Sequence, residues 1–314
     1  MRVDAGDEVL FADAYGLADR GHAIANTVET QFGIASGAKG FTAVTVASLI
    51  EEGVLDLAAP ARTFLRGDLP LIGDDVTIEH LLAHRSGIGD YLDEELDHGV
   101  DEYLMPVPVH ELATTEQYLA ALDGHEAKFR PDERFSYCNG GYVVLALIAE
   151  RASDVAFHEL VLVRVCEPAG MQDTAFLRSD ELPGRAAVGY LSDDAARTNV
   201  FHLPVRGSGD GGIYSTVADL ASFWRALFGG RLVSADWVAR LMRPRSDVPE
   251  SSRRYGLGFW LHETSDVVML VGSDAGVSFC SVHDPGRRLT HTVISNTSRG
   301  AWPVTRLLSE RLSA

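Results

Sequence analysis

The sequence predicts an α+β fold, an α/β sandwich in which helices flank one antiparallel sheet built from both ends of the chain. Three observations lead to this prediction. Strand-like apolar runs occur before residue 35 and again after residue 254. Helix-like runs dominate the segment between about residues 60 and 204. No repeat, low-complexity stretch or linker divides the 314 residues into independently folding pieces.

The first part of the chain has the predicted order strand, strand, turn, helix. Residues 8–16 mix alternating and continuous apolar positions and end at a glycine, and residues 30–34 predict a second strand. Over residues 37–52 the apolar positions follow a helical spacing. Gly53 is placed to end this helix, because glycine adopts the backbone conformation that terminates helices.

The rest of the chain first predicts helices and then strands. Helix-like runs lie at residues 78–83, 115–122, 140–151, 156–166, 217–228 and 303–312, and strand-like runs at 255–261, 267–271, 277–282 and 290–295. We therefore expect a sheet-containing domain formed by residues 1–59 and 205–314, and a mostly helical domain formed by residues 60–204. The active site is expected at their interface.

Composition excludes some partners. The net charge of −18 argues against nucleic acid and anionic membranes, because both would repel the chain. No apolar run approaches the roughly 18 residues of a membrane helix, and the first residues lack a signal peptide. We expect a cytoplasmic protein, or an extracytoplasmic one if the N-terminus is truncated. The three cysteines match no metal or redox motif.

Lysine is rare in this chain. Only Lys39 and Lys128 are lysines among the 27 basic residues, so arginine provides nearly all of the positive charge. Arginine stays protonated in proteins, whereas a desolvated amine can lose its proton. A lysine in this chain is therefore a good candidate for acid–base chemistry, although for Lys128, in a polar run, an ordinary surface role is the better interpretation.

Ser36 and Lys39 form a Ser-x-x-Lys pattern where a strand meets an apolar helix. Three residues are nearly one helical turn, so the amine and the hydroxyl project from the same face. The helix N-terminus favours negative charge near the serine, and burial would lower the pKa of the lysine. The tetrapeptide alone is also compatible with a helix-capping serine and a solvated lysine.

Two other interpretations of this segment fail. A phosphate-binding loop needs a glycine directly before its lysine, and Ala38 occupies that position. A Gly-x-Ser-x-Gly nucleophile turn is found at no serine of the chain.

A second candidate group is Tyr137-Cys138-Asn139, in a turn that opens the helix over residues 140–151. An ammonium ion near a phenol stabilises the ionised form, so Tyr137 beside Lys39 is expected to act as a base toward Ser36 or to pass a proton to the leaving group. Asn139 offers a donor and an acceptor to a substrate amide. Taken alone, a turn with a core tyrosine explains this pattern as well.

Several segments in matching order make the chain resemble the serine β-lactamase and penicillin-binding-protein superfamily, on its class C, D-peptidase and esterase branch. They are Ser36–Lys39, the string His80-Leu-Leu-Ala-His84-Arg-Ser-Gly, Tyr137–Asn139, residues 168–171, Gly211-Gly-Ile-Tyr-Ser-Thr and Tyr255-Gly-Leu-Gly. Their joint occurrence over nearly the whole chain is far more specific than any one of them.

The resemblance implies roles for individual residues. Ser36 would be the nucleophile, Lys39 and Tyr137 would share the general-base role, and Asn139 would hold the substrate amide. The oxyanion hole would combine the backbone N–H of Ser36 with one from an edge strand that carries the family's third motif.

That third motif departs from the family pattern. Relatives have Lys-Thr-Gly or His-x-Gly, whereas here Ser273 stands where the basic residue is expected and Ala275 where the first glycine is. Gly276 is then the expected oxyanion donor. Loss of a charge-assisted contact to a substrate carboxylate is worth about 10- to 100-fold in binding, so esters or uncharged amides fit better than penicillins unless an arginine such as Arg206 approaches.

The predicted function is a serine hydrolase that forms an acyl-enzyme on Ser36 and cleaves small esters or amides, with weak β-lactamase activity as a neighbouring activity. A class C-like β-lactamase and a non-catalytic binding protein are the alternatives. His84 is interpreted as structural, because Leu81 lies where a zinc-binding helix needs its glutamate. We expect no metal and no cofactor, a small-molecule ester, amide or β-lactam as substrate, and no nucleic-acid or membrane partner; the oligomeric state is left open.

Overall fold

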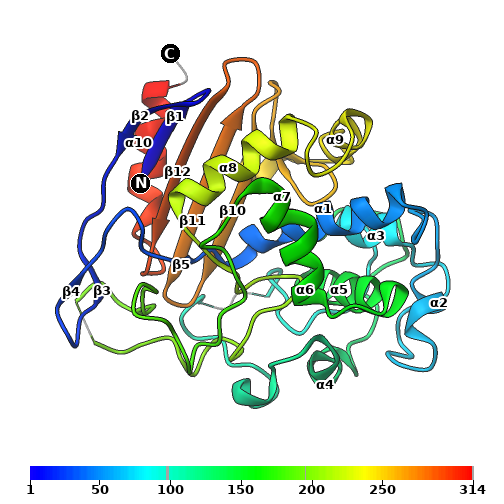
Figure 1. The fold of residues 1–314 in the computed structure, drawn as a ribbon. Helices are drawn as coiled ribbons and strands as arrows, with labels where there is room; N and C mark the ends of the chain where they lie inside the picture. Colours follow the sequence, from blue (N-terminus) through cyan, green and yellow to red (C-terminus); the bar gives the residue numbers. More distant parts are fainter. Residues whose placement is uncertain (97–98, 195, 313–314) are drawn as a thin grey trace.

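The computed structural model describes residues 1–96, 99–194 and 196–312, and the centre of this part of the chain is an eight-stranded sheet (Figure 1). The strand order is β2-β1-β12-β11-β10-β9-β8-β7, and neighbouring strands run antiparallel. The strands are β1 (Arg2–Ala5), β2 (Glu8–Ala12), β7 (Ser246–Val248), β8 (Arg253–Tyr255), β9 (Trp260–His262), β10 (Val268–Asp274), β11 (Val277–Asp284) and β12 (Leu289–Ser295). The predicted antiparallel sheet from both chain ends is confirmed.

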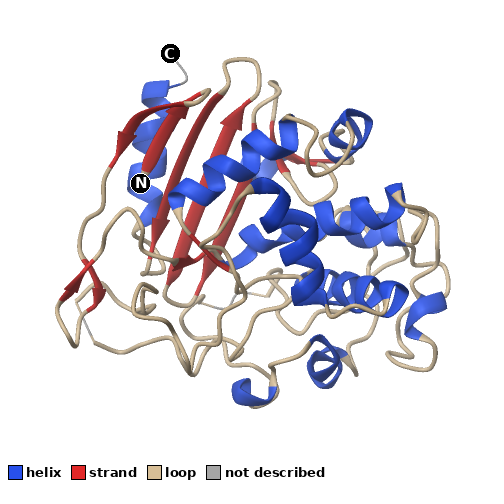
Figure 2. Ribbon diagram, in the orientation of Figure 1, coloured by secondary structure: helices blue, strands red, loops and turns tan. Residues whose placement is uncertain are grey.

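Helices cover both faces of this sheet (Figure 2). Side chains alternate between the faces of a strand, so a strand covered on both sides is buried throughout. The strand β11 is buried along nearly its whole length. On one face Cys280 and Val282 pack with Trp302 of α10 (Ala301–Leu312). On the other, Trp224 of α8 (Val217–Phe228) donates through its indole N–H to Ser281 Oγ at 2.8 Å.

The remaining helices lie beside and below the sheet in the view of Figure 1. They are α1 (Ala38–Glu51), α2 (Arg62–Leu65), α3 (Ile78–Leu82), α4 (Leu119–Leu122), α5 (Asn139–Ser153), α6 (Phe157–Val161), α7 (Glu167–Ala169) and α9 (Ala235–Leu241). Short 3-10 turns include η1 (Ala35–Gly37) and η3 (Thr115–Tyr118), and η4 (Leu162–Cys166) continues α6 as a π-helix. Short strand pairs are formed by β3 (Leu17–Asp19) with β4 (Ile24–Ala25) and by β5 (Phe32–Gly33) with β6 (Tyr214–Ser215).

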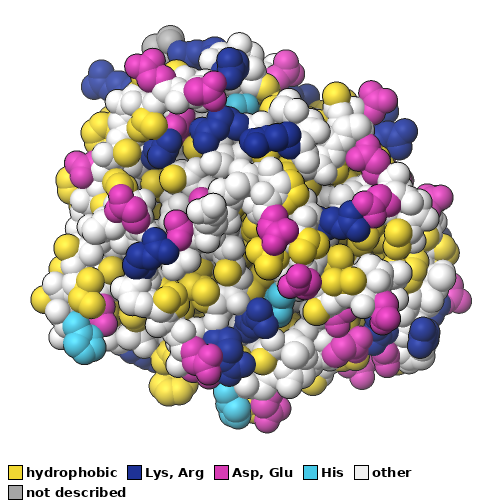
Figure 3. All heavy atoms as spheres, in the orientation of Figure 1, with side chains coloured by type: hydrophobic (Ala, Val, Ile, Leu, Met, Phe, Trp, Pro, Cys, Tyr) yellow, Lys and Arg dark blue, Asp and Glu magenta, His cyan; other side chains and the backbone are white. Residues whose placement is uncertain are grey.

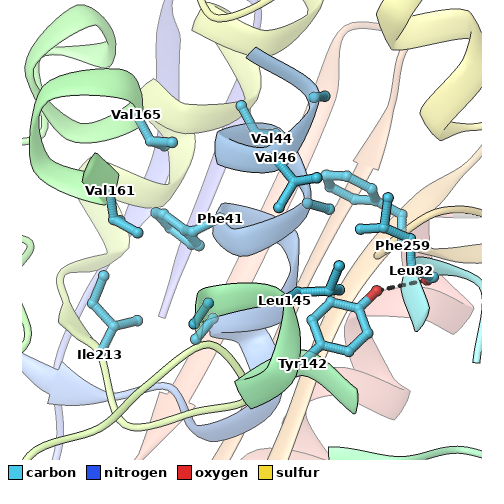
Figure 4. Packing of buried hydrophobic residues seen from close by; sticks show 14 of the residues in the cluster. Phe41, Val44, Val46, Leu82, Tyr142, Leu145, Val161, Val165, Ile213 and Phe259 are labelled. Carbon is cyan, nitrogen blue, oxygen red and sulfur yellow. Dashed lines mark hydrogen bonds between the residues drawn. The ribbon is translucent and has the colours of Figure 1, made fainter. Parts of the chain in front are cut away.

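Helix α1 is the centre of the main core. Its apolar residues point in all directions, as expected for a helix surrounded by protein, and Phe41, Val44 and Val46 are fully buried. Figure 4 shows them between helices of the middle segment and Phe259 from the C-terminal segment. In the same view the Tyr142 hydroxyl donates to the Leu82 carbonyl at 2.7 Å. This core draws on both of the expected domains, and the division at residues 59/60 and 204/205 stays a prediction.

Three predicted strands differ from the structure. The run 30–34 contains only β5, which pairs with β6 outside the eight-stranded sheet. The run 8–16 contains only the short β2, and the sheet already begins at Arg2 in β1. The run 255–261 spans a hairpin of β8 and β9 rather than one strand. Its apolar pattern is continuous because the turn residues Leu257 and Phe259 are fully buried, while Gly258, at φ +88°, makes the reversal possible.

The described helices include none with the length and apolar content that a bilayer crossing requires. On the face drawn in Figure 3, acidic and basic side chains are interspersed. The excess negative charge is therefore not gathered into one continuous patch on that face.

Candidate active site

Ser36 lies at a tight turn held against the sheet. It is the middle residue of η1, which leads directly into α1, and Ala35 before it has φ +46°, a conformation that non-glycine residues seldom adopt. Gly272 of β10 lies so close to this turn that a Cβ there would be 2.1 Å from the Ile34 carbonyl oxygen. The turn therefore fixes Ser36 at the edge of β10, with its side chain half-buried.

Lys39 is 2% exposed and lies one turn further along, directly beneath Ser36. Its ammonium group donates to Ser36 Oγ at 2.9 Å, to Asn139 Oδ1 at 2.8 Å and to the Asp210 carbonyl at 2.8 Å. Removal from water lowers the pKa of Lys39, although the negative charges of Asp210 and Glu94 oppose this shift. Lys39 thus holds its proton less firmly than an exposed lysine, as a general base at neutral pH requires.

Tyr137 reaches the same hydroxyl from the loop before α5. Lys39 Nζ lies 4.8 Å from the centre of its ring, and its phenol interacts with the Ser36 side chain. Desolvation, followed by the charge of Glu94, raises the pKa of Tyr137 well above its ordinary value. This direction runs against the expectation that the ammonium stabilises a phenolate, because removal from water favours the protonated phenol of Tyr137.

Asn139 begins α5 and connects Lys39 to an acidic loop. Its amide nitrogen donates to the Leu92 carbonyl at 3.1 Å and to Glu94 Oε1 at 3.3 Å. Its backbone N–H donates to Asp90 Oδ2 at 2.6 Å, and burial raises the pKa of Asp90 to about 6. In this structure Asn139 orients Lys39, so the predicted contact with a substrate amide would have to replace one of these bonds.

A cavity of about 820 Å³, measured with its open mouth, lies over Ser36. It also contains Asn139 and Ser273, so the structure brings these predicted site residues together. Its charged lining side chains are three carboxylates, Glu94, Asp210 and Asp274, and no lysine or arginine lines it in the described part of the chain. Arg206 points elsewhere and donates to the Phe176 carbonyl at 3.0 Å.

The prediction that Gly276 supplies the oxyanion N–H is wrong. That N–H already donates to Ser298 Oγ at 2.8 Å, and Gly276, at φ +69°, belongs to the two-residue turn between β10 and β11. The sequence pattern alone does not show where β10 ends and its turn begins.

The backbone N–H of Ser273 has the orientation that an oxyanion donor needs and that the N–H of Gly276 lacks. Asp274 and Val277 flank the two-residue turn, so they must form a pair that exchanges both backbone hydrogen bonds. Because bonding directions alternate along an antiparallel strand, the N–H of Ser273 then points away from β11. The pairing of β10 with β9 covers only Val268 and Met269. The outer edge at Ser273 is therefore open toward the cavity.

His84 supports Tyr137 from behind. Its ring centre is 4.2 Å from that of Tyr137, and its Nδ1 accepts the Cys138 N–H at 3.1 Å. His80 instead accepts the Thr77 N–H at the start of α3, at 3.2 Å. The two histidines of the i, i+4 pair thus have separate structural tasks, as interpreted for His84.

Sequence reasoning missed the carboxylates around Lys39. Asp90, Asp210 and Asp274 come from three distant segments, and Asp210 also accepts a short hydrogen bond from the Tyr91 hydroxyl. The one available indication was that Asp210 lies within the glycine-rich stretch 207–212, where the backbone can approach the site closely.

The fold and the site together define a penicillin-recognising type of protein: a serine at the start of a buried helix, a lysine one turn on and a tyrosine from a loop, meeting at the edge of an antiparallel sheet. The chain belongs to the Beta-lactamase family, whose model matches residues 3–313.

Comparison with known proteins agrees with this assignment. A penicillin-binding protein from Bacillus halodurans has a similar crystal structure, with a TM-score of 0.92 and 33% identity, covering 98% of this chain and 95% of that one. Penicillin-binding protein 4* of Bacillus subtilis is 28% identical over 86% of this chain and 61% of its own length. A D-aminopeptidase of Brucella anthropi is 28% identical over 82% of this chain and 47% of its own. This chain thus spans less than two thirds of both curated relatives.

Proposed function

We propose that this chain is a serine hydrolase that cleaves small esters or amides through an acyl-enzyme on Ser36. The observation that carries the proposal is the convergence on one half-buried hydroxyl of the Lys39 amine, at 2.9 Å, and the Tyr137 phenol, at the floor of a cavity. A nucleophile within hydrogen-bond reach of its base is the arrangement that covalent catalysis requires.

The structure suggests a division of roles. Lys39 acts in its neutral form, which its lowered pKa makes more accessible, and takes the proton of Ser36 as Oγ attacks the substrate carbonyl. Tyr137, which holds its proton at rest, donates to the leaving alcohol or amine as the C–O or C–N bond breaks, and is reprotonated through Lys39. Water then attacks the acyl-enzyme, its proton passes to the same pair, and the carboxylic acid product leaves as Ser36 is restored.

The oxyanion hole in this proposal consists of the backbone N–H groups of Ser36 and Ser273. Ser36 is the second residue of a 3-10 turn, so its N–H is among those left without a partner inside the turn. Ser273 offers an N–H at the open edge of β10 across the same cavity. Two preorganised donors of this kind stabilise the tetrahedral intermediate, and removal of one typically costs about 100- to 1000-fold in kcat.

The test is covalent labelling. After incubation with a fluorophosphonate, or after quenching during turnover of p-nitrophenyl acetate, intact-mass spectrometry should show one adduct on wild type and none on Ser36→Ala. Ser208→Ala is a matched control, because Ser208 is another buried serine near the glycine-rich stretch but does not line the cavity. Absence of an adduct with every acylating probe would instead favour a binding protein without turnover.

A second comparison separates the hydrolase from a class C-like β-lactamase. The cavity contains three carboxylates and no lining lysine or arginine among the described residues, which disfavours the carboxylate of a penicillin. We expect p-nitrophenyl acetate turnover to exceed nitrocefin turnover. The reverse order would support the β-lactamase.

A further inference from the structure

One carboxylate of the cavity has no role in the proposed reaction. The Asp210 carboxylate accepts a hydrogen bond from the Tyr91 hydroxyl, and the Asp210 carbonyl accepts one from Lys39. Glu94 accepts a hydrogen bond from the Asn139 side chain. Asp274, by contrast, accepts among the described residues only the N–H of the next residue, Ala275, through Oδ1 at 2.9 Å. No ion pair within the described residues includes Asp274. Lys39 attracts Asp274 but forms no ion pair with it, and Asp210 and Glu94 repel it, so a cationic group entering the cavity would be stabilised there.

The position of Asp274 fixes where such a group would lie. Gly272 is in contact with the turn that carries Ser36, and Ser273 offers its N–H to the oxyanion. Strand residues advance by about 3.3 Å, so Asp274 lies roughly 7 Å beyond Gly272 along β10. In an aminoacyl group on Ser36 the amino nitrogen lies about 2.5 Å from the carbonyl carbon, so the Asp274 side chain has to reach back along the strand toward Ser36 to meet it. Asp274 also lines the same cavity as Ser36.

We propose that Asp274 is a specificity-determining residue that binds the ammonium group of substrates with a free amine beside the scissile carbonyl, that is, amino-acid amides or esters. The proposal rests on acyl transfer at Ser36. At the strand end where the family resemblance predicts a basic residue, this chain has Ser273 followed by Asp274. The cavity around this position is lined by three carboxylates, which repel a substrate carboxylate and attract an ammonium.

Asp274→Asn is a suitable variant, because asparagine keeps the shape and the oxygen that accepts the Ala275 N–H while removing the charge. Three p-nitroanilides of alanine, in both enantiomers, vary only the charge beside the carbonyl: the free amine, the N-acetyl and the N-succinyl derivative. In wild type we expect kcat/KM to fall in that order, with the free amine favoured at least about 10-fold over N-acetyl. In Asp274→Asn this ratio should fall about 10-fold, while the N-acetyl rate stays within about 2-fold.

Two variants complete the design. Asp274→Glu should retain part of the preference, because the charge remains, and Asp266→Asn, at an exposed position between β9 and β10, should leave it unchanged. A wild-type preference for N-acetyl or N-succinyl substrate, or a preference that survives Asp274→Asn, would overturn the proposal.

Binding separates this proposal from the proposed reaction. Ser36→Ala cannot be acylated, so titration calorimetry with alaninamide and N-acetylalaninamide measures charge preference alone. Tighter binding of alaninamide to Ser36→Ala than to the Ser36→Ala/Asp274→Asn double variant supports the assignment of Asp274 even if wild type shows no turnover. Equal binding to both refutes it even if Ser36 is acylated.

Discussion

At the scale of single residues, the site depends on opposite shifts in two neighbouring groups. Burial favours the neutral form of any ionisable side chain. It therefore raises the fraction of Lys39 in the neutral form that accepts a proton, and it keeps the proton on Tyr137. The ring of His84 fixes the position of the phenol, and Asn139 fixes that of the amine. Tyr137 therefore starts in the proton state that departure of the leaving group needs, whereas Lys39 must first release one of the protons with which it contacts Ser36, Asn139 and Asp210.

Asp274 should be unfavourable for stability at neutral pH. Removal from water, followed by repulsion from Asp210 and Glu94, raises its pKa to about 7. In the unfolded chain an aspartate titrates at about 4. As the pH rises from about 4 to about 7, the carboxylate ionises more readily in the unfolded chain, so its contribution to folding becomes steadily less favourable and then stays constant. Asp274→Asn removes this contribution.

The expected result is that the thermal midpoint of Asp274→Asn exceeds that of wild type by a few degrees at pH 8 and by much less at pH 5. Calorimetry at both pH values, with Asp266→Asn as the exposed control, gives the comparison. A midpoint difference that does not depend on pH would show that the charge of Asp274 is already compensated in the folded protein.

At the scale of elements, the contact between η1 and β10 positions the nucleophile relative to the oxyanion donors. A Cβ on residue 272 would lie 2.1 Å from the Ile34 oxygen and 3.1 Å from the Gly37 nitrogen, so Gly272→Ala must push the turn away from the strand. Overpacking of this kind costs about 1–3 kcal/mol. Because the displaced atoms are those that carry Ser36, we expect acylation by p-nitrophenyl acetate to slow about 10- to 100-fold or more.

Gly67→Ala is the matched control, because a Cβ at Gly67 would meet nothing within 4 Å. Stopped-flow acylation rates and thermal midpoints should be measured for both variants. If Gly272→Ala is acylated as fast as wild type, the turn can move without affecting the reaction.

Elements with a strong local pattern could be predicted from the sequence, and those set by long-range packing could not. The helix α8 was predicted at its observed bounds, since its apolar stripe and its Thr216 cap are both local features. The pairing of β10 with β11 depends on which residues form the turn, and a shift in that assignment led to Gly276 instead of Ser273. The carboxylates Asp90 and Asp274 became site residues only through tertiary contacts.

At the scale of the whole molecule, both lysines serve the region around the site. Lys39 lies beneath Ser36, and Lys128 forms ion pairs with Asp93 at 2.8 Å and Glu95 at 3.1 Å. These two carboxylates flank Glu94, which accepts from Asn139. The ordinary surface role expected for Lys128 is therefore too simple, because Lys128 holds the loop that contacts Asn139.

The net charge of −18 and the acidic cavity should act together on charged substrates. A negative cleft in a negative protein attracts cations over a distance that salt shortens, from a screening length of about 30 Å at 0.01 M to about 3 Å at 1 M. If Asp274 binds an ammonium, kcat/KM for alanine p-nitroanilide should fall several-fold between about 0.02 M and about 0.5 M NaCl. The N-acetyl derivative should change little and the N-succinyl derivative should improve, because salt also screens its repulsion. Initial rates at substrate concentrations well below KM give kcat/KM for all three substrates. Equal salt dependence of kcat/KM for the three substrates would mean that the electric field of the protein does not reach the reacting group.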